Sequence, residues 1–120
     1  MGPLQLARLY ALKSLWTSTG FRSAGRALVD ALDSSDEGVR TVAGMFLVQA
    51  GKQAEPLVEE AIHQRKNLST VLVIAGDIGA VRLEPELRRF TGDADPQVAK
   101  AARDGLRILA AATSGAEAKQ

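Results

Sequence analysis

A short residue pattern occurs twice in this chain, beginning at Asp36 and again at Asp95, 59 residues later. In both copies a valine follows three positions on, an alanine seven positions on and a leucine eleven positions on. A second echo, Glu-Pro with a leucine close behind, begins at Glu55 and again at Glu84, 29 residues apart. Recurrence near thirty residues is typical of stacked helical hairpins. The chain is therefore predicted to be an all-α solenoid, a class that more often presents surfaces to partners than sites for chemistry.

The composition is that of an ordinary folded domain. Hydrophobic residues make up 46% of the 120 residues and charged residues 24%, which is enough apolar material for one core. Only five residues are aromatic, so the core is expected to consist mainly of alanine, leucine, valine and isoleucine. Small side chains of this kind allow helix axes to approach closely.

Charge and residue types exclude several classes of function. A net charge of +1 gives no bulk attraction for nucleic acid or an anionic membrane. The absence of cysteine excludes disulfides, thiolate nucleophiles and cysteine metal sites. No apolar run has the roughly 20 residues that cross a bilayer, and the first residues lack a secretory signal pattern. We therefore expect a cytoplasmic protein with no membrane contact.

Proline, glycine and capping residues divide the chain into seven expected helices. These cover residues 3–16, 21–32, 37–50, 56–66, 68–76, 85–90 and 96–111, with Ser34 and Glu37 at capping-box spacing before the third helix. The count gives about three and a half antiparallel hairpins. We expect a single domain over residues 1–112 and a flexible tail over 113–120, where the residues are small and polar.

One segment favours a second interpretation. Val71 to Ile74 is rich in β-branched residues and leads into Gly76 and Gly79, as a buried strand entering a glycine loop does. No other segment reads as a parallel strand, and a lone strand has nothing to pair with. A helix is favoured, with the strand as the alternative.

The repeated pattern carries a family resemblance. Asp36, Val39, Arg40, Ala43 and Leu47, with the later Gly51 and Pro56-Leu57, resemble the HEAT repeat, and most closely the short HEAT-like repeats of bacterial proteins and phycobilin-lyase subunits. The resemblance covers about residues 20–110. It departs from the family where the Arg40 position becomes Ala99. The pattern specifies a fold and says little about function.

Candidate chemistry can be weighed residue by residue. His63, the only histidine, has acidic neighbours but no set of three or four converging metal ligands. Gly20 and Gly25 have phosphate-loop spacing, yet the lysine and hydroxyl residues that bind phosphate and magnesium are missing. No nucleophile, base and orienting group form a recognisable set. We expect no catalytic residues, no cofactor and no metal, and hence no enzyme activity.

The favoured function is a small scaffold that mediates protein–protein interaction. In HEAT-like proteins the second helix of each hairpin usually lines the inner curve. By that resemblance, the candidate partner-binding residues here are Arg22, Arg26, Glu59, His63, Arg88 and Arg89. Two alternatives stay open: a partner-dependent subunit of a lyase-type enzyme, and a weak binder of nucleic-acid backbone through Lys100, Arg103 and Arg107. Nucleic acid is the less favoured ligand because Asp104 interrupts that basic stripe.

The two ends of the expected stack are apolar. The first helix carries leucines, Tyr10 and Trp16 around a wide arc, and the last helix ends in Ile108-Leu109-Ala110-Ala111. Exposed apolar patches usually mark association. We expect one or both ends to be covered in a homodimer or against a larger protein.

Overall fold

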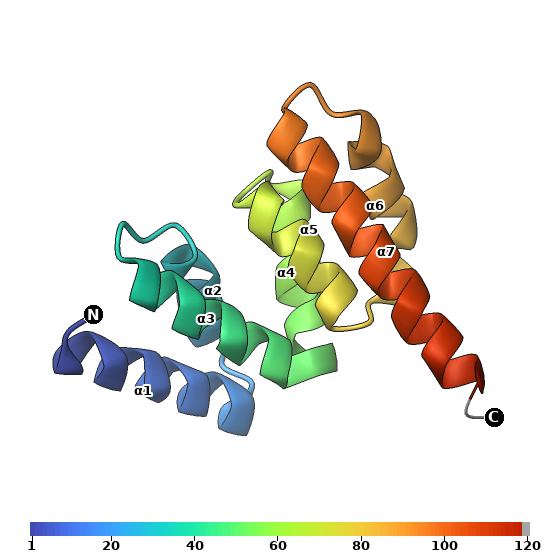
Figure 1. The fold of residues 1–120 in the computed structure, drawn as a ribbon. Coiled ribbons are helices and arrows are strands. Elements are labelled where there is room, and N and C mark those ends of the chain that lie inside the picture. Colours follow the sequence, from blue (N-terminus) through green and yellow to red (C-terminus); the bar gives the residue numbers. More distant parts are fainter. Residues whose placement is uncertain (119–120) are drawn as a thin grey trace.

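The structure is a computed structural model that describes the backbone of residues 1–118 and the side chains of residues 1–114. Within residues 1–118 the chain forms seven α-helices (Figure 1). They are α1 (Pro3–Thr19), α2 (Arg22–Ala31), α3 (Glu37–Ala50), α4 (Glu55–His63), α5 (Leu68–Asp77), α6 (Glu84–Arg89) and α7 (Pro96–Ala118). Short 3₁₀ turns, η1 (Gly51–Ala54), η2 (Val81–Leu83) and η3 (Phe90–Gly92), join or extend them. The all-α prediction is confirmed: residues 1–118 contain no strand, and Val71 to Ile74 are helical.

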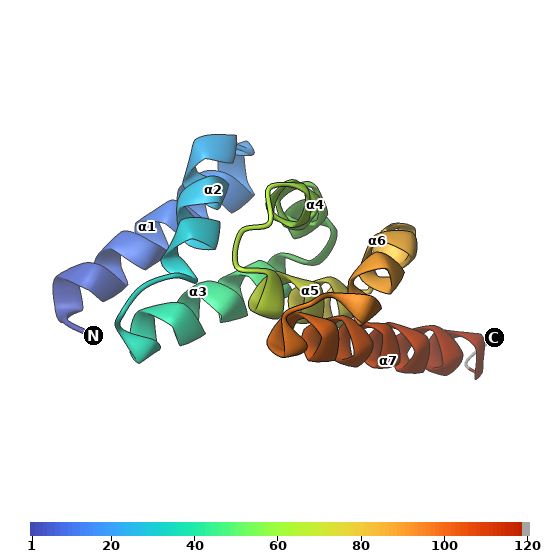
Figure 2. The same cartoon turned by 90° about the horizontal axis from the view of Figure 1, so that it is seen from above.

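The helices lie in two layers. Figure 2 shows α2, α4 and α6 on one side and α3, α5 and α7 on the other, with α1 beside α2 and α3. The molecule is correspondingly flat, about 40 × 38 × 21 Å. One continuous cluster of buried side chains includes residues from all seven helices. Its largest fully buried members are leucines, valines and an isoleucine, as the scarcity of aromatic residues predicts.

Local chemistry explains most helix ends. Pro3 and Pro96 occupy the first position of α1 and α7, where the missing N–H costs nothing. Gly20 ends α1 in the left-handed conformation, with φ +73°, and donates its N–H to the Trp16 carbonyl. The expected capping box is wrong: the Asp36 carboxylate, not Ser34, caps α3 by accepting the Val39 N–H at 3.1 Å. Ser34 instead accepts the N–H of Asp36.

Three helices differ from the prediction by three residues or more, and the first is α1, which continues to Thr19 instead of ending near residue 16. α4 stops at His63 rather than near Lys66, because Arg65 takes the left-handed conformation with φ +54°. The N–H groups of Arg65 and Lys66 then bond back to Ile62 and Ala61, the hydrogen-bond pattern of a Schellman motif. α7 continues to Ala118 instead of ending near Ala111, so the tail expected over 113–120 is helical as far as the structure describes it. Alanine is the strongest helix former, and it recurs through this last stretch.

The tightest helix pair is α5 with α7. Their backbones meet at Gly76 and Gly105, where a methyl group on Gly76 would lie 2.5 Å from the Gly105 carbonyl oxygen. Only glycine permits this approach. By contrast, α3 and α5 touch over a short length, and in Figure 1 they diverge toward their amino ends. The two junctions of α5 are therefore unequal, and the groove described below lies at the looser one.

Candidate binding surfaces

The six residues proposed as a partner surface lie on α2, α4 and α6, the layer where they were expected. All but Arg22 form ion pairs with other residues of the chain. Arg88 pairs with Glu84 and Arg89 with Glu86 within α6, while the other pairs join α4 to α2, to η2 and to α6. Much of this surface charge is thus already matched inside the molecule. Their role in binding a partner stays a prediction.

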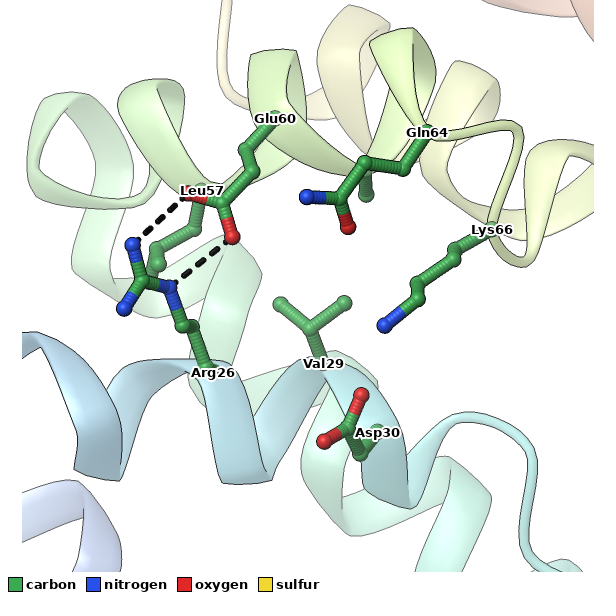
Figure 3. Close-up of a pocket in the computed structure, with 8 residues that line it drawn as sticks. Arg26, Val29, Asp30, Leu57, Glu60, Gln64 and Lys66 are labelled. Carbon is green, nitrogen blue, oxygen red and sulfur yellow. Dashed lines mark hydrogen bonds and ion pairs between the residues drawn. The ribbon is translucent and has the colours of Figure 1, made fainter.

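Arg26 and Glu60 link α2 to α4. The guanidinium donates two hydrogen bonds to the carboxylate, at 2.9 and 3.0 Å, and Figure 3 shows the two groups facing each other. This hydrogen bonding lowers the pKa of Glu60 and raises the pKa of Arg26. Both side chains are partly exposed, so the pair orients the two helices more than it stabilises them.

Arg82 of η2 makes the corresponding link for α4. It donates hydrogen bonds to both carboxylate oxygens of Glu59, at 2.9 and 3.2 Å, and one to Glu55 at 3.2 Å. These bonds lower the pKa of Glu59. Sequence reasoning missed Arg82, since it lies in a turn and its partners are more than twenty residues away.

His63 lies on the exposed side of α4, with its Nε2 atom 3.7 Å from the Glu86 carboxylate. Glu86 also accepts a hydrogen bond from Arg89 at 3.0 Å. Within the described residues, no three histidine or carboxylate side chains are grouped so as to hold a metal ion. The imidazole of His63 and the carboxylate of Glu86 thus form a surface contact between α4 and α6.

A small pocket lies between α2 and α4, beside the Arg26–Glu60 pair (Figure 3). Val29 and Leu57 provide apolar walls, and Gln64 and Lys66 stand at the rim. Its volume is about 60 Å³, well below the ~300 Å³ at which small-molecule sites begin. It can hold water or the end of one side chain.

A larger, apolar groove lies between α3 and α5, on the other layer. Gly44, Met45 and Val48 of α3 and Val73 and Ile74 of α5 form its apolar part, and Thr41, Ser69 and Thr70 also line it. The groove is shallow and open to solvent, with a volume of about 350 Å³. Met45 is 49% exposed although its side chain is apolar. Gly44 leaves the floor open, since a methyl group there would meet no atom closer than 3.8 Å. No sequence pattern marked this groove, because it results from the divergence of two helices.

The two ends of this groove differ in charge. Arg40, near the amino end of α3, is held by a hydrogen bond that its guanidinium donates to the Ser34 carbonyl at 2.7 Å. Asp77 is the last residue of α5, and partial burial raises the pKa of its carboxyl above the usual value. None of the ion pairs among the described side chains includes Asp77. A carboxylate at the carboxyl end of a helix, partly out of water, favours a cationic partner.

The amino-terminal helix is exposed along most of its length. Only Leu9 and Trp16 of α1 are buried, while Leu4 is 87%, Tyr10 52% and Leu15 45% exposed. The prediction of an apolar surface at this end is confirmed. At the other end it holds in part: Ala110 and Ala111 are exposed, whereas Leu109 is buried and Ile108 is half-buried. The basic residues Lys100, Arg103 and Arg107 of α7 are also exposed. Asp104 pairs with Lys100 and Arg107, at 2.7 and 3.4 Å, and partly neutralises that basic stripe.

Comparison with known proteins adds no assignment: no family model, no curated protein and no solved structure matches the chain. The HEAT-like resemblance therefore stays a prediction. Of the helices that the structure describes, none combines the length and apolar character needed to cross a membrane.

Proposed function

We propose that the protein is a small HEAT-like scaffold without catalytic activity, and that it binds a helical segment of another protein in the α3/α5 groove. The observation that carries this proposal is the groove itself, an apolar surface lined by Met45, Val48, Val73 and Ile74 at the divergence of two helices. An amphipathic helix laid into an apolar groove is a recurrent mode of recognition. The charged second-helix surface is the weaker candidate because its residues pair with one another.

The groove also defines the chemistry of its ligand. A bound helix would place apolar side chains at i, i+3 or i+4, and i+7 against the walls, with small residues over Gly44. Asp77 at one end calls for a lysine or arginine of the partner, whereas Arg40 at the other end calls for an acidic residue. These two charges would set the direction in which the helix lies.

The test compares two variants in which an exposed apolar residue is replaced by glutamate. Met45→Glu charges the lip of the groove, and Val81→Glu makes the same change at a site that is 55% exposed and outside it. Each variant and the wild-type protein are immobilised, exposed to lysate of the source cells, and the retained proteins are quantified by mass spectrometry. We expect at least one protein to be retained by the wild type and by Val81→Glu, and lost at least tenfold with Met45→Glu.

Binding that Met45→Glu leaves unchanged would reject the groove as the binding surface. Circular dichroism checks that both variants keep the helical spectrum of the parent. A further arm uses Asp77→Asn, which should weaken binding of the same protein with less effect than Met45→Glu, because it removes one charge at the groove end.

A further inference from the structure

The exposed side of α1 is a second apolar surface, distinct from the α3/α5 groove. We call it the α1 face and define it by Leu4, Ala7, Tyr10, Ala11, Ser14, Leu15 and Ser18, all of them exposed. We propose that a second copy of this chain covers the α1 face, with the two α1 helices antiparallel across a two-fold axis near Ala11. This inference does not depend on the groove or its ligand.

α1 lacks the charged outer side that a surface helix normally has. A helix that is apolar on every side is normally buried, whereas surface helices carry charge on the side away from the core. α1 contains no acidic residue, and its basic residues are Arg8 and Lys13. The Lys13 ammonium already lies over the Phe46 ring, 4.8 Å from its centre, and 6.0 Å from that of Tyr10. Burying the α1 face would therefore desolvate no carboxylate and would involve one charge, on Arg8.

Charge selects the second copy over a head-to-tail contact. The opposite end of the molecule, the outward side of α7, carries Lys100, Arg103 and Arg107. Joining it to α1 would bring these groups toward Arg8, which is a contact between like charges. A contact of α1 with α1 brings only the two Arg8 side chains toward each other, and it closes after two copies.

The antiparallel direction follows from the same residues. In a parallel pair the two Arg8 side chains would stand side by side. In an antiparallel pair centred on Ala11 they are six residues apart along the axis, about 9 Å at 1.5 Å per residue. That separation is about the screening length of physiological salt, so repulsion between them is small. Leu15 of each copy would then lie over Ala7 of the other, and the helix dipoles would oppose.

The area is sufficient for a dimer of moderate strength. The exposed parts of Leu4, Tyr10, Leu15 and the small residues between them amount to roughly 500 Å² per copy, or about 1,000 Å² for two. This lies below the roughly 1,200–2,000 Å² of stable specific interfaces and at the value of about 1,000 Å² that a weaker biological association needs. Association and side-chain ordering offset much of the gain, so we expect a dissociation constant of about 1–10 µM.

The absence of cysteine from the chain allows a direct test. Ala11→Cys, oxidised at 50 µM protein, should give a disulfide-linked dimer. Ala110→Cys, on the exposed side of α7, is the control for random collision, and Ala7→Cys is the control for direction. In the antiparallel pair the two Ala7 positions are eight residues apart, about 12 Å, and should cross-link poorly. In a parallel pair they would link as readily as Ala11.

Sedimentation velocity supplies a second measurement. The wild-type protein should pass from monomer to dimer between about 0.5 and 50 µM, and a Leu4→Glu, Leu15→Glu double variant should stay monomeric over that range. Met45→Glu should dimerise like the wild type, which separates failure of this proposal from failure of the groove. A wild-type monomer at 50 µM, growth beyond a dimer, or equal linking of Ala11→Cys and Ala110→Cys would overturn the proposal. Should the double variant lose its helical spectrum, the cysteine cross-links decide.

Discussion

Replacing Gly76 by alanine tests the close contact of α5 with α7. Two effects oppose each other. Alanine in a helix is favoured over glycine by up to about 1 kcal/mol. Against this, the new methyl group would lie 2.5 Å from the Gly105 carbonyl oxygen and 3.0 Å from its Cα. Both are backbone atoms, which cannot rotate away, so α5 and α7 would have to separate by at least about half an ångström.

The second effect should win. Overpacking of a well-packed core costs about 1–3 kcal/mol, and a clash with backbone atoms belongs in the upper part of that range, about 2–3 kcal/mol. After the gain in helix propensity, the net loss is about 1–2 kcal/mol. For a chain of this length the entropy of unfolding is about 0.25 kcal/mol per kelvin, so Tm should fall by about 4–8 °C. Gly105→Ala should behave alike, since its methyl group would meet the Leu72 carbonyl oxygen.

Gly44→Ala is the matched control. Gly44 is also helical, yet a methyl group there would have only Leu32 Cδ2 nearby, at 3.8 Å. Here the propensity term acts alone, and Tm should rise by about 2–4 °C. Thermal and urea unfolding followed by circular dichroism at 222 nm measure all three variants. If Gly76→Ala were as stabilising as Gly44→Ala, the reasoning from the backbone contact would be refuted.

Three further predictions concern charge and turn geometry. Arg26→Gln should reduce the loss of stability between pH 7 and pH 3. The pKa of Glu60 is lowered in the folded protein, so the stability that its ionised form contributes is lost as pH falls through that pKa. Urea unfolding midpoints at the two pH values measure the difference. Asp77→Asn should raise the stability at pH 7 and have little effect at pH 3. The pKa of Asp77 is raised in the folded protein, so its ionised form destabilises the fold above that pKa. Equal gains in stability at both pH values would contradict this. The Arg65→Gly variant should be about 1 kcal/mol more stable than the Arg65→Ala variant. Both variants lose the ion pair with Asp93, but only glycine accepts φ +54° without strain. Thermal unfolding compares the two variants, and equal Tm values would exclude strain at this residue.

Helix boundaries were predictable where local chemistry decides them. Pro3, Gly20, Gly51 and Pro96 stand where the sequence places the start or end of a helix, because a missing N–H or a positive φ acts within one turn. The β-branched segment around Val71 was resolved as helix by the lack of any partner strand. Burial on α5 outweighs the local preference of these residues.

Two of the errors originate in contacts between distant residues. Arg65 ends α4 without a glycine because its guanidinium is held by Asp93 at 3.1 Å and lies over the Phe90 ring, 5.3 Å from the ring centre. Gly76 suggested the end of a helix, although α5 includes it and needs its small size for the contact with Gly105. Nothing in the sequence near these residues shows such neighbours.

The same limit applies to the candidate surfaces. The residue types on α2, α4 and α6 were identifiable as charged helix faces, but their pairing with Arg82 and Glu86 depends on how the helices pack. The groove at Met45 depends on the angle between α3 and α5, which sequence periodicity does not determine. The exposed α1 face was predictable, since apolar residues around a whole helix are visible in the sequence.

The contact of Gly76 with Gly105 has a mechanical consequence. Because the backbones of α5 and α7 are in contact, neither helix can tilt or slide without a steric clash, so the two helices should move as one rigid body. Bending of the molecule then concentrates at the seam between α3 and α5. We expect a ligand bound between α3 and α5 to change the angle between these two helices, and with it the curvature of the whole protein.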